Sequence, residues 1–435
     1  MTFSMIDFIE RKRDKGRHTD AELADFVRGV RDAEIPDYQT SAWLMAAYLN
    51  GLERPELGAF TKELAHSGDI VKLPGGRTAV DKHSTGGVGD KTTLVVAPLV
   101  ACCGLNVAKL SGRGLGFTGG TVDKLEAIPG MNMHLSTKAF ARQIAEIGVA
   151  VTGHSMALAP AEGKFYALRD VTGTVSSIPL IASSIVSKKI AGGADAFVFD
   201  VKCGSGAFMQ TYEDAEALAR SLVDLSASLG RRSVCLISDM EQPLGTWVGN
   251  SAEVLEAIEV LSGRGPADTR DLSVALAAEM LVAGGVSLDS DSAKRIAAEK
   301  LQSGEALEKF TEVVRMQGGD SRVCREPLSI LPLAVKREAV AAELDGFVSR
   351  LDARTVGYAI RALGGGRARK EDDIDAGVAI ELVKKVGDRV SKGEPLAILH
   401  YNTEAQLRNA LPYMVSAYAC SDSAQYRTLL LGRVA

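Results

Sequence analysis

The chain has 435 residues, of which 46% are hydrophobic, and a formal net charge of -5 at pH 7. Length and composition predict a globular protein of about two or three domains, and the acidic balance excludes a nucleic-acid partner, because such binding needs a basic face. No apolar run reaches the roughly 18 residues of a membrane span, and residues 1–50 lack a signal-peptide pattern, which favours a cytoplasmic protein. The six cysteines lack zinc-site spacing and are expected to be reduced.

The N-terminal part, residues 1–68, has a helical pattern. Thr19 and Glu22 have the spacing of a capping box, Pro36 precedes the apolar stretch 42–49, and Gly51 can end that stretch. These signals predict a small helical layer, which is the first part of a helical domain.

After residue 69 short β-rich runs alternate with helical ones. The β-rich runs include 105–110, 148–152, 196–201 and 234–237. Such alternation predicts an α/β domain with a mostly parallel central sheet, whose first part is 69–159 and whose second part is 192–335.

Two glycine-rich loops lie in the first part of this α/β domain. Residues 82–90 place Lys82, His83 and Ser84 before a glycine turn, and residues 91–103 fit a helix that follows it. Residues 111–124 contain five glycines, with hydroxyls at Ser111 and Thr121. Glycines leave backbone N–H groups free to surround an anion, so the two loops together predict a phosphate site. Neither loop matches the common nucleotide-binding motifs.

Residues 160–191 interrupt the alternation with helix-prone sequence. Tyr166, Arg169, Ser184, Lys188 and Lys189 have spacings that can share one helical face. If this segment packs with residues 1–68, the helical domain is discontinuous, and a ligand is expected to bind between it and the sheet.

Residues 336–435 change pattern again. Turns at Gly365, Gly387 and Gly393 separate short alternating strands, which predicts a third domain of the α+β kind. The expected fold class is therefore α/β, with a small discontinuous all-helical domain, a large α/β domain with a mostly parallel central sheet, and a C-terminal α+β domain.

Residues 111–126 closely resemble the hallmark of the thymidine and pyrimidine-nucleoside phosphorylase family, Ser-Gly-Arg-Gly-Leu-Gly-His-Thr-Gly-Gly-Thr-Leu-Asp-Lys-Leu-Glu. The resemblance extends through 81–90, 166–170, 178–189, 200–209 and 237–250. It implies a homodimer joined through the helical part. It also implies reversible phosphorolysis, in which inorganic phosphate attacks C1′ of a pyrimidine nucleoside and releases the base and a pentose 1-phosphate. Phosphate is then a co-substrate, and no organic cofactor is implied.

The resemblance also implies roles for the matching residues. His83 matches the proposed general acid, since an imidazole titrates near neutrality and can protonate the departing base. Arg169 and Lys188 would share catalysis by stabilising the negative charge of that base. The phosphate-binding set is Lys82, Ser84, Thr93, Lys109, Ser111 and Thr121, and the pyrimidine-binding set is Arg169, Ser184 and Lys188.

Some family members hold a structural potassium ion, and Gly89, Leu244 and Glu256 match the positions that supply its oxygen ligands. Lys91 adjoins this site here and could displace the ion with its own charge.

Two further positions affect specificity. Phe117 replaces the hallmark histidine, which predicts a hydrophobic wall or a relaxed secondary contact. Lys109 stands where thymidine-selective relatives tend to carry an apolar residue and uridine-tolerant ones a lysine. A broad enzyme for uridine, thymidine and deoxyuridine is therefore favoured over a strict thymidine phosphorylase.

Two other function classes compete. An anthranilate-type phosphoribosyltransferase would share the architecture and require magnesium, for which Asp90, Asp123 and Asp200 could be offered as ligands, yet no convincing acidic pair stands beside the loops. A non-catalytic nucleoside-binding protein is disfavoured, because the basic residues and the histidine that the reaction needs are all present.

Overall fold

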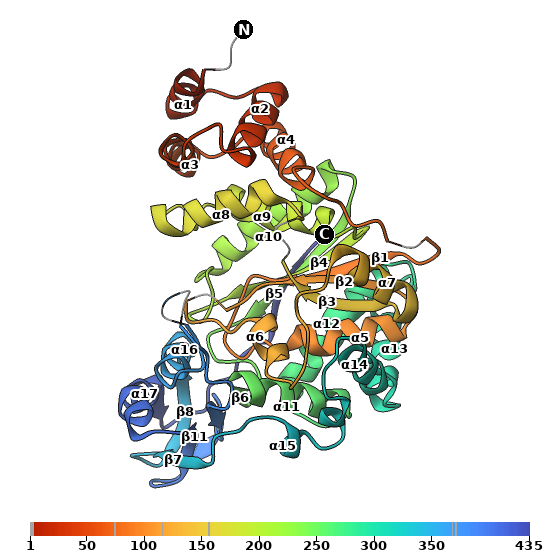
Figure 1. The fold of residues 1–435 in the computed structure, drawn as a ribbon. Helices are drawn as coiled ribbons and strands as arrows, with labels where there is room; N and C mark the ends of the chain where they lie inside the picture. Colours follow the sequence, from red (N-terminus) through yellow and green to blue (C-terminus); the bar gives the residue numbers. More distant parts are fainter. Residues whose placement is uncertain (1–3, 74, 115, 155–156, 368, 370–371) are drawn as a thin grey trace.

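The computed structural model describes residues 4–73, 75–114, 116–154, 157–367, 369 and 372–435. Figure 1 shows a helical layer at one end, an α/β layer in the middle and a mixed layer at the other end. The predicted fold class is confirmed.

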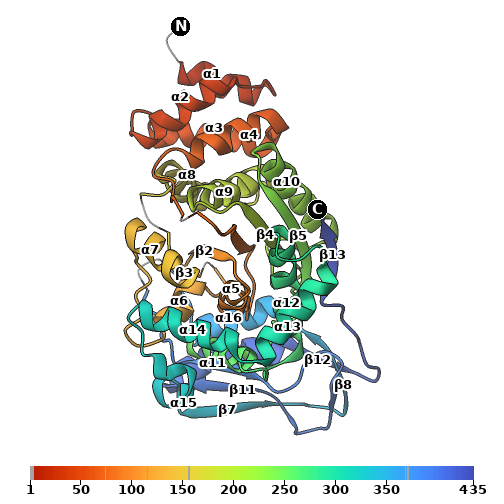
Figure 2. The same cartoon turned by 90° about the vertical axis from the view of Figure 1, so that its right-hand side faces the viewer.

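Four helices from the N-terminal part and two from the middle of the chain form the helical layer. The capping box of Thr19 and Glu22 is present at the start of the second helix, and Gly51 follows the third with φ 73°, as predicted. The later pair packs against the earlier helices, so segments far apart in sequence lie side by side (Figures 1 and 2). The helices are α1 (Met5–Arg13), α2 (Asp20–Arg31), α3 (Asp37–Asn50), α4 (Arg54–Ala65), α8 (Pro160–Thr172) and α9 (Ile178–Ala191).

A buried histidine lies in the aromatic core of this layer. The ring of His18 stacks on Phe8 with centroids 3.5 Å apart, and its Nε2 accepts a hydrogen bond from Trp43 Nε1 at 3.0 Å. Burial, and then the ammonium of Lys12, lower the pKa of His18 to about 4. The folded state therefore favours the neutral ring.

This low pKa predicts an acid-sensitive helical layer. The folded pKa of His18 lies below the unfolded value of 6.5, so its contribution is present above pH 6.5 and is lost as the pH falls towards 4. The expected loss is about 3 kcal/mol of unfolding free energy. Urea unfolding of wild type and His18→Gln across this range measures it: the substitution should remove the loss, and parallel pH curves would contradict the prediction.

The central sheet has six strands in the order β13-β5-β4-β1-β2-β3. The first five strands of the chain are parallel, as predicted, and each predicted β-rich run lies in one of them. The last strand of the chain pairs antiparallel with β5 at the sheet edge. The strands are β1 (Ala79–Ser84), β2 (Asn106–Ser111), β3 (Val149–Gly153), β4 (Ala196–Cys203), β5 (Arg232–Asp239) and β13 (Leu430–Val434).

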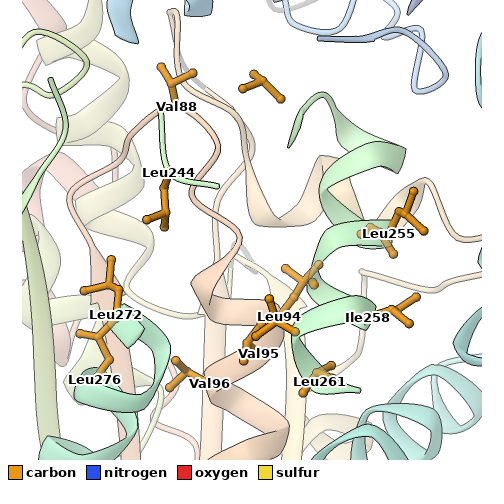
Figure 3. Packing of buried hydrophobic residues seen from close by; sticks show 14 of the residues in the cluster. Val88, Leu94, Val95, Val96, Leu244, Leu255, Ile258, Leu261, Leu272 and Leu276 are labelled. Carbon is orange, nitrogen blue, oxygen red and sulfur yellow. The ribbon is translucent and has the colours of Figure 1, made fainter. Parts of the chain in front are cut away.

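Helices cover both faces of this sheet (Figure 2). The first ten residues of α5 are buried, which explains its uniformly apolar sequence. Figure 3 shows Val88 of the first glycine loop beside Leu244, above the cluster that α5, α11 and α12 form. The helices of the α/β part of the chain, not all of which touch the sheet, are α5 (Thr92–Cys102), α6 (Thr121–Glu126), α7 (Thr137–Ile147), α10 (Tyr212–Ser228), α11 (Asn250–Leu261), α12 (Ala267–Ala283), α13 (Ser290–Gln302), α14 (Glu305–Met316), η1 (Ser321–Cys324) and α15 (Pro327–Ile330).

The C-terminal domain has two antiparallel sheets, β10-β8-β12 and β6-β9-β11-β7, and two helices. Its β6 comes from the α/β part of the chain. The assignment of all of 336–435 to this domain is wrong at its end, because β13 returns to the central sheet, where Arg433 pairs with Glu279 of α12 at 3.0 Å. The elements are β6 (Trp247–Val248), β7 (Lys336–Ala341), β8 (Gly346–Leu351), α16 (Ala353–Ala362), β9 (Ala379–Leu382), β10 (Arg389–Val390), β11 (Pro395–Tyr401), α17 (Glu404–Ala417) and β12 (Tyr418–Ser421).

Within the described ranges, every helix is too short or too polar to traverse a lipid bilayer.

Candidate active site

The two glycine loops leave neighbouring strands at the same edge of the sheet. Ser84 is the last residue of β1 and Ser111 the last of β2, and these parallel strands are adjacent. The Oγ of Ser111 is buried and has no hydrogen-bond partner among the residues that the structure describes. Because a buried hydroxyl without a partner costs about 1–3 kcal/mol, this atom indicates a place where a ligand completes the site.

Each loop leads into a helix. Thr93 lies in the first turn of α5 and Thr121 is the first residue of α6, so both predicted phosphate contacts lie where backbone N–H groups face outward. The second loop closes on itself: a Cβ at Gly120 would lie 2.1 Å from the backbone nitrogen of Gly114. Only glycine fits there. Leu115, within the hallmark, lies outside the described residues.

A buried network of charges lies behind the first loop. Lys82 Nζ donates to Thr92 Oγ1 at 2.6 Å and lies 3.7 Å from the carboxylate of Asp200 and 3.9 Å from that of Asp90. Lys202 Nζ lies 2.7 Å from Asp200. Burial lowers the pKa of Lys82. Lys82, which is predicted to bind phosphate, therefore contacts Thr92 and the two carboxylates in this structure, and it supports the first glycine loop through them.

Each of the three carboxylates considered as a magnesium ligand is paired with lysine or arginine side chains. Asp90 and Asp200 belong to the network with Lys82 and Lys202. Asp123 lies 3.0 Å from Arg113 and 2.8 Å from Arg367. This pairing disfavours a divalent-metal site formed by these acids.

The predicted pyrimidine residues Ser184 and Lys188 are joined by a carboxylate. Ser184 Oγ donates to one oxygen of Glu162, and Lys188 Nζ lies 2.8 Å from the other. The ammonium also lies over the Tyr166 ring, 5.2 Å from its centroid. Helices α8 and α9 therefore bring the two residues together through Glu162, which is 4% exposed.

Arg169, the third predicted pyrimidine residue, contacts backbone carbonyls. Its guanidinium donates to the carbonyls of Thr174, Val175 and Leu180 at 3.3, 2.7 and 3.0 Å. The side chain thus fixes the turn between α8 and α9. Arg169, Ser184 and Glu162 nevertheless line one small cavity in the helical layer.

His83 lies near the end of β1, directly before Ser84, and is half-buried. Burial lowers its pKa well below the ordinary value, and the ammonium groups of lysines on α9, β2 and β1 lower it further. Both effects disfavour the imidazolium form in the free protein. The lysines, in order of effect, are Lys189, Lys109, Lys188 and Lys82.

Lys109 is directed to protein oxygens. Its Nζ donates to the carbonyl of Lys82 at 2.7 Å and to that of Leu110 at 3.3 Å, and it lies 3.8 Å from Asp81. Asp81 also binds Lys189 at 2.7 Å. A contact of Lys109 with phosphate or ribose would require it to exchange one of these partners.

Phe117 connects the second loop to the C-terminal domain. The Arg354 guanidinium lies over its ring at 5.0 Å, and the Tyr358 ring meets it edge-on at 5.9 Å. The Phe208 ring is 6.4 Å away. Phe117, in place of the hallmark histidine, therefore provides cation–π and aromatic contacts between this loop and α16.

The three residues implied to bind potassium, Gly89, Leu244 and Glu256, also lie close together. A Cβ at Gly89 would lie 2.4 Å from the carbonyl oxygen of Leu244, and Leu244 and Glu256 both accept hydrogen bonds from Lys91.

Sequence reasoning missed three polar residues of this region. Glu162 precedes Tyr166 by four residues and Arg169 by seven, so helical spacing alone places the three on one face. Asp81 lies beside the loop lysine in sequence. His154 directly follows β3, the neighbour of β2 in the central sheet.

Comparison with known families agrees with the three layers. Residues 6–68 match the model described as "Glycosyl transferase family, helical bundle domain", 76–307 match "Glycosyl transferase family, a/b domain", and 347–421 match "Pyrimidine nucleoside phosphorylase C-terminal domain".

Comparison with curated proteins gives close relatives. The chain is 49% identical over 401 residues to a pyrimidine-nucleoside phosphorylase of Staphylococcus haemolyticus (strain JCSC1435) and equally to one of Staphylococcus aureus (strain USA300). Each alignment covers 92% of this chain and 92% of the relative. Among solved structures, anthranilate phosphoribosyltransferase from Thermus thermophilus shares the fold, with a TM-score of 0.58 and 18% identity, over 71% of this chain and 98% of the other.

Proposed function

Because this chain belongs to the pyrimidine-nucleoside phosphorylase family, we propose that it catalyses the reversible phosphorolysis of uridine, thymidine and deoxyuridine to the free base and ribose or deoxyribose 1-phosphate. The structural observation that carries the proposal is that the two glycine loops leave the adjacent parallel strands β1 and β2 at one edge of the sheet, where the buried Oγ of Ser111 has no hydrogen-bond partner among the described residues. Phosphate-dependent release of uracil from uridine tests it.

On the loop side, inorganic phosphate is the nucleophile. The hydroxyls of Ser84, Ser111, Thr93 and Thr121 and the N-termini of α5 and α6 would supply its hydrogen bonds, with Lys82 and Lys109 as the nearby charges. The buried Oγ of Ser111, which no described residue contacts by a hydrogen bond, supports this assignment. Holding the nucleophile in place removes much of the entropic barrier to attack on C1′.

On the helical side, the departing pyrimidine gains negative charge as the C1′–N bond breaks. Lys188 would stabilise that charge, Ser184 would orient the base, and Arg169 would complete the pocket. Glu162 holds the Lys188 ammonium and the Ser184 hydroxyl in position before substrate arrives. His83 would donate a proton to the base oxygen.

His83 needs its proton before that step. Its pKa is low in the free protein because burial and ammonium groups disfavour the imidazolium. A phosphate dianion in the loops would offset those ammonium charges and raise the pKa again. Phosphate binding would therefore precede and promote protonation of His83.

The range of nucleosides that the enzyme accepts is proposed to depend on Lys109. We propose a broad pyrimidine-nucleoside enzyme in preference to a strict thymidine phosphorylase, with the ammonium helping to accommodate the ribose 2′-hydroxyl. Lys109→Met is expected to lower uridine turnover by about 10- to 100-fold relative to thymidine turnover, since one charge-assisted hydrogen bond is worth about 1.5–3 kcal/mol. Paired initial rates measure the ratio. An unchanged ratio would contradict this role.

An anthranilate-type phosphoribosyltransferase remains the second reading that the shared fold allows. The pairing of Asp90, Asp123 and Asp200 with lysines and arginines supports phosphorolysis instead. Phosphorolysis in the presence of a chelator would separate the two activities. We also propose a cytoplasmic role in nucleoside salvage, where the six free thiols would stay reduced.

We propose further that the enzyme is a homodimer joined through the helical layer. Exposed apolar side chains on α1, α3 and α8 support this surface: Ile6, Tyr38, Met45, Leu49 and Val171. Leu49→Arg is expected to give a monomer, because a charge would be buried at the interface. Light scattering after gel filtration measures the mass, with Leu288→Arg on the α/β layer as the matched control. A dimeric Leu49→Arg variant or a monomeric wild type would contradict the surface.

A further inference from the structure

A buried lysine ammonium lies among the residues implied for potassium. Lys91 caps the N-terminus of α5 and is fully buried. Its Nζ donates to the carbonyls of Leu244 and Trp247 at 3.0 and 2.8 Å and to Glu256 Oε1 at 3.0 Å. An ammonium has three donors, and each of these has an acceptor.

The carboxylate of Glu256 also has hydrogen-bond partners at both of its oxygens. Its Oε1 also accepts from Thr269 Oγ1 at 3.1 Å. Its Oε2 accepts from the backbone nitrogens of Thr246 and Trp247 at 2.9 and 2.6 Å and from Thr246 Oγ1 at 3.2 Å. Both oxygens thus have protein donors, and the negative charge of Glu256 is balanced by Lys91.

A second lysine takes other oxygens of the same loop. Lys385 Nζ donates to the carbonyls of Pro243 and Gly245 at 2.9 and 3.0 Å and pairs with Asp268. Lys91 and Lys385 together therefore occupy the carbonyls of Pro243, Leu244, Gly245 and Trp247.

The packing around Lys91 is tight. A Cβ at Gly245 would lie 1.8 Å from Glu256 Oε1 and 2.8 Å from Lys91 Nζ. A metal cation placed beside the ammonium would also meet strong repulsion, because the site is buried. The residues of this chain therefore do not fit a potassium ion at Gly89, Leu244 and Glu256.

We propose that Lys91 is a built-in replacement for the monovalent cation, so that the protein folds and acts without potassium. The Lys91 ammonium joins the start of α5 to the 243–247 loop. A neighbouring backbone hydrogen bond, from Leu244 N to Val88 O at 3.1 Å, joins that loop to the first glycine loop. Figure 3 shows Val88 and Leu244 next to each other. Loss of the ammonium would loosen the first glycine loop.

The test compares wild type, Lys91→Met and Lys91→Thr in potassium chloride, sodium chloride and choline chloride at equal ionic strength. Thermal unfolding midpoints are the main readout, and phosphate-dependent base release is the second. The wild type should show the same midpoint and rate in all three salts. Lys91→Met should unfold at a lower temperature in every salt, because it leaves Glu256 without its cation.

Lys91→Thr leaves space and an oxygen in place of the ammonium, so potassium should restore part of its lost midpoint and choline should restore none. A wild type whose midpoint falls when potassium is withdrawn would overturn the proposal, and so would a folded Lys91→Thr variant that responds to no cation. If neither variant folds, the salt series on the wild type decides alone. The midpoint does not depend on the proposed activity, so the two proposals fail separately.

Discussion

Lys188→Met is expected to lower kcat/KM for uridine phosphorolysis by about two to three orders of magnitude. The ammonium is the charge that faces the developing pyrimidine anion in the proposed mechanism, and methionine keeps most of its length without the charge. The substitution also leaves the Glu162 carboxylate, 2.8 Å from Nζ in the wild type, as an added negative charge beside the base. Both the ground-state binding and the transition state should therefore suffer, so KM rises and kcat falls.

A second substitution separates chemistry from folding. The Lys188 side chain is 20% exposed, so breaking its pair with Glu162 should cost no more than about 3 kcal/mol, the low end for a buried pair. Glu162→Gln added to Lys188→Met removes the unpaired charge and keeps an acceptor for Ser184. Stability measured by urea unfolding should recover, and activity should not. Lys138→Met on α7 is the exposed lysine control. Recovery of activity together with stability would contradict a direct role for Lys188.

His83→Ala is expected to lower kcat by about 10²–10⁴-fold with a much smaller change in the nucleoside KM, because general acid catalysis acts in the transition state. Steady-state rates with uridine under saturating phosphate give both parameters. A variant that loses nucleoside affinity and keeps its kcat would remove the general-acid assignment.

The low pKa of His83 leads to a further prediction about protons taken up on phosphate binding. Burial and the Lys189 ammonium lower the pKa of His83 in the free protein, and the phosphate dianion should raise it again. At neutral pH, phosphate binding should therefore take up more protons in the wild type than in a His83→Ala variant. Calorimetric titration of phosphate in buffers of different ionisation enthalpy measures that uptake, and His83→Ala should reduce it.

Much of the fold could be predicted from local patterns. The two glycine loops and the strands before them follow from glycine spacing and β-rich runs, because backbone geometry at these positions is set by residues near in sequence. Likewise, Thr19 and Glu22 predict the start of α2 through a bond between neighbours. The return of β13 to the central sheet could not be predicted, since it depends on pairing with β5, about 190 residues earlier in the chain.

Candidate positions for the site could be named from sequence patterns and the resemblance, whereas the contacts of those residues could not. The resemblance and the loop pattern indicated Lys82, Lys109 and Arg169, yet their charged ends are bound to Thr92, to backbone carbonyls and to the turn after α8. Those partners come from other segments, so only the folded chain shows them. Glu162 gave a helical-spacing signal, but a carboxylate on a helix is usually solvated, and its burial became visible only with α9 packed against α8.

Release of uracil from uridine, followed with and without inorganic phosphate in a buffer that contains a metal chelator, tests the proposed phosphorolysis most directly. We predict release only when phosphate is present, with one ribose 1-phosphate formed for each uracil. Release that ignores phosphate, or no release until magnesium is supplied, would contradict it.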